Sequence, residues 1–129
     1  MPGNPVISIV DNDMSVREAV LGLMRATGFI AESFHSAEHF LRSGGSSKAS
    51  CLIADMRMPG MSGLELQSHL AAAGTPIPTI LITAFPDERD RECAKKSGAI
   101  CYLIKPFKEA DLLSCIEASL ATSRSASRK

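Results

Sequence analysis

Polar side chains follow two apolar segments of the chain, at the point where each segment ends. Asp11 and Asn12 come directly after the apolar run 6–10, and Asp55 comes directly after a second run, 51–54. Oxygen donors of this kind suit a hard cation such as Mg²⁺. A carboxylate can also attack phosphorus and form an aspartyl-phosphate. These residue types therefore point to metal-assisted phosphoryl chemistry, provided that the fold brings the two segments together.

Two further polar residues follow apolar runs later in the chain. Thr83 comes after Ile82 in the run 79–82, and Lys105 follows the run 100–104. A lysine can offset charge on phosphoryl oxygens, and a threonine hydroxyl can donate a hydrogen bond to them. Taken singly, a strand-ending acid, a strand threonine and a loop lysine are all ordinary structural residues. They acquire a chemical meaning only as a set.

The apolar runs have the features of strands in a parallel sheet covered on both faces, because they are short and nearly all apolar. Helical patterns lie between them, with Ser15 and Ser62 in capping-box sequences and Pro86 suited to a first helical turn. Strands that alternate with single helices form right-handed βαβ units. We therefore predict an α/β fold of the flavodoxin-like type: a doubly wound five-stranded parallel sheet, strand order 2-1-3-4-5, with helices on both faces and strands at 6–10, 29–34, 51–54, 79–82 and 100–104.

This topology predicts where the polar residues meet. In an open α/β sheet, ligands bind beyond the carboxyl ends of the strands, where the strand order reverses. Strands one, three, four and five would present their polar residues at that edge: Asp11 and Asn12, Asp55, Thr83, and Lys105.

Length and composition indicate one soluble domain. The chain has 129 residues, which fits a single domain, predicted here as residues 1–122. Residues 123–129 are serine-rich and basic, typical of a polar tail or the start of a linker to an output domain. Lys and Arg balance Asp and Glu at 14 each, so the segment has no charge-based affinity for nucleic acid or membrane. Without a signal sequence or an apolar run of about 18 residues, a cytoplasmic location is expected.

The four cysteines, at positions 51, 93, 101 and 115, form no C-x-x-C pair and no zinc-type spacing with histidine. Cys51 and Cys101 fall in strand-like runs, where a free thiol behaves as a small hydrophobe. We therefore expect a reducing compartment and thiols that are buried or inert.

Four motifs together resemble the receiver domain of two-component response regulators, over essentially residues 5–121. The chain most resembles receivers of DNA-binding regulators of the nitrogen-fixation and nitrate-response type. The resemblance is specific because all four motifs occur in order and at matching spacings: Ile-Val-Asp-Asn-Asp at 9–13, Asp-Met-Arg-Met-Pro-Gly-Met-Ser-Gly at 55–63, Leu-Ile-Thr-Ala at 81–84 and Lys-Pro-Phe at 105–107.

The resemblance implies roles for individual residues. Asp55 would be the phosphoacceptor, Lys105 would contact the phosphoryl group, and Thr83 would be the switch hydroxyl. Tyr102 matches the aromatic switch position. The peptide bond between Lys105 and Pro106 matches one that is usually cis.

The resemblance also implies a Mg²⁺ or Mn²⁺ site formed by Asp11, Asp55, the backbone carbonyl of Arg57 and residue 12. The family normally has a second acid at position 12, as a direct metal ligand, and this chain has Asn12. An asparagine keeps an oxygen ligand but removes one negative charge, and ligand charge sets affinity in such sites. We therefore expect weakened rather than abolished Mg²⁺ binding. Asp13 is not expected to compensate.

By resemblance, the chain is a phosphoacceptor signalling domain rather than an enzyme, with self-catalysed phosphoryl transfer and slow autodephosphorylation. Its implied partners are a sensor histidine kinase and, after activation, a second copy through the fourth helix, fifth strand and fifth helix, roughly residues 86–120. DNA would be bound only through an output domain outside these residues.

Two alternatives differ in class. A degenerate receiver would act as an interaction module without phosphorylation, with Asn12 as its support. A flavodoxin-like cofactor binder would need a Ser/Thr/Gly-rich phosphate cradle after the first strand, where this chain has Asp-Asn-Asp-Met. A nucleotide-binding loop of the form GxxxxGKS is also absent from the sequence.

Overall fold

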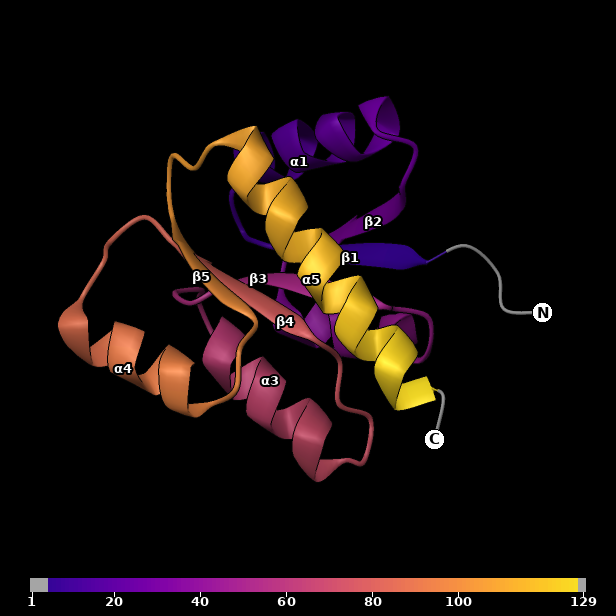
Figure 1. Cartoon of the computed structure of the whole chain (residues 1–129). Helices are drawn as coiled ribbons and strands as arrows, with labels where there is room; N and C mark the ends of the chain where they lie inside the picture. Colours follow the sequence, from indigo (N-terminus) through magenta and orange to yellow (C-terminus); the bar gives the residue numbers. More distant parts are fainter. Residues whose placement is uncertain (1–4, 128–129) are drawn as a thin grey trace.

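A computed structural model describes the backbone of residues 5–127 and the side chains of residues 5–122. The described residues form a five-stranded sheet in the order β2-β1-β3-β4-β5 (Figure 1). Every adjacent pair of strands is parallel. The predicted fold class and strand order are confirmed, with strands β1 at Val6–Val10, β2 at Ile30–Phe34, β3 at Cys51–Asp55, β4 at Thr79–Thr83 and β5 at Cys101–Ile104.

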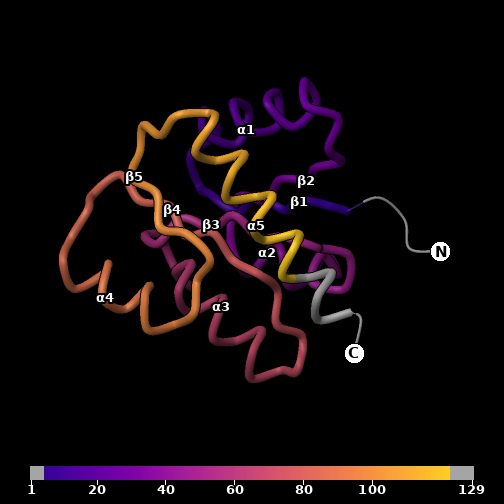
Figure 2. Tube along the Cα trace, in the orientation of Figure 1, coloured from indigo at the N-terminus to yellow at the C-terminus, as the bar shows by residue number. Residues whose placement is uncertain are grey.

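Helices follow each strand, as Figure 2 shows along the chain. They are α1 at Met14–Ala26, α2 at Ala37–Arg42, α3 at Gly63–Ala72, α4 at Glu88–Lys96 and α5 at Glu109–Ser127, with a short 3₁₀ helix at Gly45–Ser47.

Two hydrophobic cores lie on opposite faces of the sheet, because successive side chains of a strand point to opposite faces. On one face, α1 and α5 cover β1, β3 and β4 through buried side chains that include Val20, Leu112 and Ile116. On the other face, α2, α3 and α4 pack through a second group that includes Phe40 and Leu66. The central strands are therefore almost wholly apolar, as expected for a sheet that is buried on both faces.

The strand register brings the polar residues to one edge. Val10 of β1 pairs with Ala54 of β3, so the residues that follow them, Asp11 and Asp55, lie next to one another. Thr83 lies one residue beyond Ile82, the β4 partner of Asp55.

Local capping signals were partly right. Ser62 caps α3, with the reciprocal capping box to Glu65 that the sequence predicts. The prediction that Ser15 caps α1 was wrong. Asp13 is the cap, and its carboxylate accepts a hydrogen bond from the backbone N–H of Ser15. An aspartate two residues earlier satisfies the free amide of Ser15, so the helix begins sooner.

The start of α4 also differs from expectation. Pro86 lies before the helix, which begins at Glu88 with Asp87 as its cap. The Asp87 side chain accepts hydrogen bonds from the backbone N–H groups of Arg89 and Asp90. These hydrogen bonds satisfy the first free amide groups of the helix, which is consistent with its start at Glu88.

The helix α5 continues to Ser127, so its backbone extends into the segment 123–129 that was expected to be a polar tail or linker. Side chains 123–127 and residues 128–129 lie outside the described part of the structure. Among the described residues, no helix combines the length and the apolar character required to cross a membrane.

The expectation of four free thiols was wrong for two of them. Cys101 and Cys115 form a disulfide bond, with their Cα atoms 6.1 Å apart. The packing of α5 against the sheet brings them together, and a separation of 14 positions carries no recognisable motif. Cys51 is a buried free thiol, and burial raises its pKa to about 11. Cys93 is a free thiol exposed on α4.

Candidate functional site

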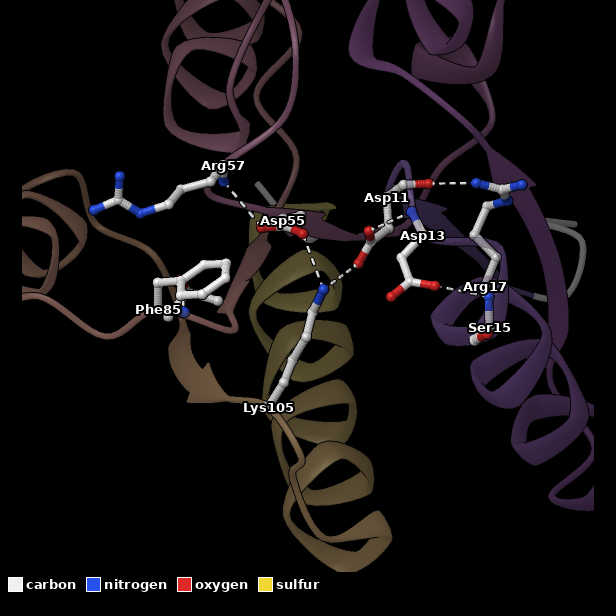
Figure 3. A network of polar contacts seen from close by, with 9 residues as sticks. Asp11, Asp13, Ser15, Arg17, Asp55, Arg57, Phe85 and Lys105 are labelled. Carbon is white, nitrogen blue, oxygen red and sulfur yellow. Dashed lines mark hydrogen bonds and ion pairs between the residues drawn. The ribbon is translucent and has the colours of Figure 1, made fainter.

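Lys105 joins the two acids at the edge of the sheet. Its Nζ atom donates hydrogen bonds to Asp11 Oδ2 at 2.8 Å and to Asp55 Oδ2 at 2.9 Å (Figure 3). The side chains are nearly removed from solvent: the exposed fraction is 0% for Asp11, 9% for Asp55 and 14% for Lys105. One cation therefore serves two buried carboxylates.

Backbone amides hold the other carboxylate oxygens. Asp11 Oδ1 accepts a hydrogen bond from the N–H of Asp13, and Asp55 Oδ1 accepts one from the N–H of Arg57, each at 2.9 Å. Each acid thus turns back onto the chain two residues further on, which fixes its orientation. The Arg17 Nη1 atom donates to the backbone carbonyl of Asp11 at 2.7 Å and ties α1 to the end of β1.

Close packing beneath the site also positions Asp55. A Cβ atom added at Gly63, the first residue of α3, would lie 2.5 Å from the Asp55 carbonyl oxygen. Glycine is therefore required for α3 to approach β3 this closely.

The charges of the site shift the pKa values of two groups. Burial raises the pKa of the Asp11 carboxyl, and the negative charge of Asp55 adds to this, while hydrogen bonds from Lys105 and the Asp13 backbone oppose it. Burial lowers the pKa of the Lys105 ammonium, but its hydrogen bonds with Asp11 and Asp55 outweigh burial and raise the pKa overall. Asp11 is thus easier to protonate than an exposed aspartate, whereas Lys105 stays charged.

The oxygen donors at this edge fit a hard divalent cation in type. They comprise the carboxylates of Asp11 and Asp55, the backbone carbonyl of Arg57 and the amide oxygen of the exposed Asn12. Within the described part of the chain, no three His, Cys, Asp or Glu side chains are grouped to hold a metal ion. The two carboxylates that a cation could use are each bonded to Lys105 through one oxygen. Asp13 caps α1 with its own carboxylate, so this acid is committed elsewhere.

Thr83 completes the edge at the end of β4. Its side chain is fully buried, and Oγ1 accepts a hydrogen bond from the N–H of Phe85 at 3.1 Å. Its backbone carbonyl accepts from the N–H of Lys105 at 2.8 Å, so β4 and β5 hold the two residues together. The bond between Lys105 and Pro106 is cis, as the resemblance implies.

Comparison with known proteins identifies this arrangement. Residues 7–117 match the family described as the response regulator receiver domain. The chain belongs to this family. The receiver domain is 45% identical over 115 residues to the response regulator protein TmoT of Ectopseudomonas mendocina, covering 89% of this chain and 52% of TmoT. It is 35% identical over 129 residues to the transcriptional regulatory protein FixJ of Azorhizobium caulinodans, covering 100% of this chain and 61% of FixJ.

Solved structures agree with this assignment. The response regulator StyR superposes with a TM-score of 0.90 at 44% identity, covering 98% of this chain and 64% of the StyR chain. The structure called FixJ-N superposes with a TM-score of 0.84 at 32% identity, covering 92% of this chain and 95% of the other. The chain spans about half the length of TmoT and similar curated relatives.

Tyr102, the expected aromatic switch, lies on β5 of the receiver domain. Its ring packs against the core formed with α2, α3 and α4. The hydroxyl is buried and has no hydrogen-bond partner among the described residues. The residue lines a pocket of about 360 Å³, which is also bordered by Asp87, Arg91 and Ile104. The ring is therefore partly inside the receiver domain, with a polar group left unpaired.

The side chain of Arg57, whose role the sequence left open, points away from Asp55 (Figure 3). Its Nη2 atom lies 2.6 Å from Asp90 Oδ2 and 3.7 Å from Asp87 Oδ2. The residue thus connects the loop after β3 to the start of α4.

Glu38, on α2, was missed by sequence reasoning. Its Oε2 atom accepts a hydrogen bond from the N–H of Met61 at 2.9 Å. The pKa of the Glu38 carboxyl is lowered by hydrogen bonds from its own backbone and from Met61. Gly60 has a φ of 79°, and a Cβ there would lie 2.7 Å from Glu38 Oε2. The Pro59-Gly60 pair is the signal in the sequence that could have drawn attention to this loop, because glycine permits a positive φ and a close approach by another element.

Proposed function

We propose that the receiver domain accepts a phosphoryl group on Asp55 from the phosphohistidine of a sensor histidine kinase. The observation that carries this proposal is the position of the Asp55 carboxylate, held by Lys105 Nζ on one oxygen and by the Arg57 amide on the other. This orients a buried nucleophile at the open end of the sheet, beside a cation.

The reaction replaces one bond to phosphorus with another. An Asp55 oxygen forms the new P–O bond while the P–N bond to the kinase imidazole breaks, and the freed imidazole takes up a proton. Lys105 moves from the carboxylates to a phosphoryl oxygen and offsets its charge. The Thr83 hydroxyl, which now accepts from Phe85, can turn to donate to another phosphoryl oxygen.

The residues suited to hold Mg²⁺ or Mn²⁺ are Asp11, Asp55, Asn12 and the backbone carbonyl of Arg57. When bound, the metal neutralises negative charge on the carboxylates and the incoming phosphoryl group. Asn12 supplies an uncharged oxygen in place of the usual acid, so we infer weaker metal binding than a three-acid site would give.

Phosphorylation would be read out through Thr83, Tyr102 and the face formed by residues 86–120. Movement of Thr83 toward the phosphoryl group opens space for the Tyr102 ring, which shifts an existing equilibrium rather than creating a new fold. This face would then pair two activated copies. Residues 1–122 would be the receiver, and 123–129 would lead to an output domain that controls transcription, as the names of relatives such as FixJ suggest.

A degenerate receiver is the second candidate, supported by Asn12 in place of the usual acid and by the pairing of Asp11 and Asp55 with Lys105. Incubation with phosphoramidate, whose P–N bond mimics phosphohistidine, and intact-mass measurement across a Mg²⁺ series separate the two. The proposal predicts a gain of one phosphoryl group that requires Mg²⁺ and is lost in Asp55→Asn. An unmodified mass at saturating Mg²⁺ would favour the degenerate receiver.

A further inference from the structure

The disulfide between Cys101 and Cys115 connects the edge strand of the sheet to the last helix. The backbone of α5 packs mainly against β3 and β4, in the middle of the sheet. The disulfide reaches past these strands to β5. It is therefore a covalent link between two elements that form part of the expected output face.

The bond also encloses a segment of the phosphoacceptor site. Residues 101–115 form a covalent ring, and Lys105 lies within it, bonded to Asp11 and Asp55. One end of this segment is fixed at β5 and the other at α5. The disulfide thus restricts the part of the chain that presents Lys105.

The same strand carries the switch aromatic on its other face. The side chain of Cys101 packs in the core beneath α1 and α5, whereas Tyr102 packs in the core beneath α3 and α4. A tether at Cys101 therefore holds β5 from the face opposite to Tyr102.

The other two cysteines provide a contrast. Cys51 is fully buried with a pKa raised by burial, which leaves it as an unreactive thiol. Cys93 is exposed and unpaired. Cys101 is half-buried on an edge strand and Cys115 is 7% exposed, so a small reagent reaches Cys101 first.

We infer that Cys101 and Cys115 form a reversible thiol–disulfide site that couples the oxidation state to the mobility of β5, α5 and the Lys105 segment. This inference does not depend on phosphorylation of Asp55. The oxidant is a small-molecule disulfide. The Cys101 thiolate attacks it, forms a mixed disulfide and releases one thiolate. The Cys115 thiolate then attacks the Cys101 sulfur and releases the second. Two protein thiols lose two electrons and two protons, and the oxidant gives two thiols.

The experiment is a redox titration of the chain with Cys93→Ser, which removes the exposed thiol that could join two molecules. Samples are equilibrated over a wide range of ratios of reduced to oxidised glutathione, quenched in acid, alkylated while unfolded and weighed intact. We expect a transition in which two thiols become protected together while Cys51 remains alkylated. The variants Cys101→Ser and Cys115→Ser, each with Cys93→Ser, should show no such transition.

The effect of the disulfide on mobility is measured by comparing the fully oxidised and fully reduced forms. We expect the melting temperature to be about 10 °C higher in the oxidised form, because a ring of this size restricts the unfolded chain. Backbone hydrogen exchange in 101–115 should slow on oxidation, with little change in α2. The Ser variants should have the same melting temperature under both conditions.

Three results would overturn the inference. The pair could stay fully reduced at every glutathione ratio, or fully oxidised at every ratio, so that no reversible site exists. The two forms could also have the same melting temperature and the same exchange in 101–115, so that the bond restrains nothing.

Discussion

Asp55 and Lys105 lie 50 positions apart in the sequence, yet their side chains meet at 2.9 Å. The same ammonium binds Asp11 at 2.8 Å, so three charged groups share one nearly buried site. One ammonium between two carboxylates leaves these three groups with a net negative charge. That surplus favours a divalent cation, and in the proposed function the Lys105 hydrogen bond holds the Asp55 carboxylate in place for a phosphoryl group.

Removing the charge of Lys105 should change both the stability of the domain and its affinity for Mg²⁺. Lys105→Met leaves Asp11 and Asp55 buried without their cation, and we expect a loss of about 3 kcal/mol in the free energy of unfolding. Because Lys105 no longer competes for the carboxylate oxygens, the variant should also bind Mg²⁺ more tightly, and added Mg²⁺ should recover part of the lost stability. Urea unfolding with and without Mg²⁺ measures both effects.

The matched control for this variant is Lys108→Met, which removes an exposed lysine three residues away. It should change neither quantity appreciably. If Lys105→Met and Lys108→Met unfold at the same urea concentration, the ion pairs contribute nothing to the fold.

The raised pKa of Asp11 gives stability a defined pH dependence. A carboxyl whose pKa is higher in the folded state binds more protons there, so its contribution to stability falls as pH rises from its unfolded value of 3.8 through the folded pKa. Asp11→Asn removes this titration. We expect the stability of the wild type relative to Asp11→Asn to decrease over that interval, as measured by urea unfolding at a series of pH values. A difference that increases with pH there would contradict the burial argument.

Titration of Lys105 should affect stability only at high pH. Its raised pKa means that its stabilising contribution is complete below the unfolded value of 10.5 and is lost only as pH rises through the folded pKa. Between neutral pH and pH 10, wild type and Lys105→Met should therefore differ in stability by a constant amount. A gap that narrows well below 10.5 would mean that Lys105 loses its proton earlier than the geometry implies.

Asn12 should limit metal affinity. Asn12→Asp restores a third acid, and we expect Mg²⁺ to bind at least about tenfold more tightly, since an added charge near 4 Å contributes up to about 4 kcal/mol before desolvation is subtracted. Calorimetric Mg²⁺ titration measures the change. Ser68→Asp adds the same charge at an exposed position of α3 and should leave the Mg²⁺ affinity unaltered. Equal affinities for Asn12→Asp and wild type would refute this role of residue 12.

The side chain of Arg57 pairs with Asp90, whereas its backbone carbonyl is the group expected to bind the metal. The Arg57 side chain is 48% exposed, so the pair should contribute at most about 1 kcal/mol. A double-mutant cycle with Arg57→Ala and Asp90→Asn should give a coupling energy below that value. Mg²⁺ affinity should stay within about twofold in Arg57→Ala, because the carbonyl is retained; a large loss would mean that the side chain itself supports the metal site.

Sequence patterns predicted the parts of the molecule that depend on local rules. Short apolar runs alternating with helical stripes predict a doubly wound parallel sheet, and the carboxyl-end rule then brings Asp11, Asp55 and Lys105 together. The features that could not be predicted from the sequence depend on contacts between elements that the fold brings together. Cys115 meets Cys101 only because α5 packs against the sheet, and Glu38 meets the Met61 amide only because α2 lies beside the loop after β3. The choice of Asp13 over Ser15 as a helix cap was a competition between two plausible caps.

The central claim is that Asp55 receives the phosphoryl group, and chemical trapping tests it most directly. After incubation with phosphoramidate and Mg²⁺, borohydride reduction converts an acyl phosphate on aspartate to homoserine, which peptide mass spectrometry locates. We expect homoserine at position 55, dependent on Mg²⁺, with Asp11 and Asp13 unmodified. Homoserine at another aspartate, or none at any Mg²⁺ concentration, would contradict it.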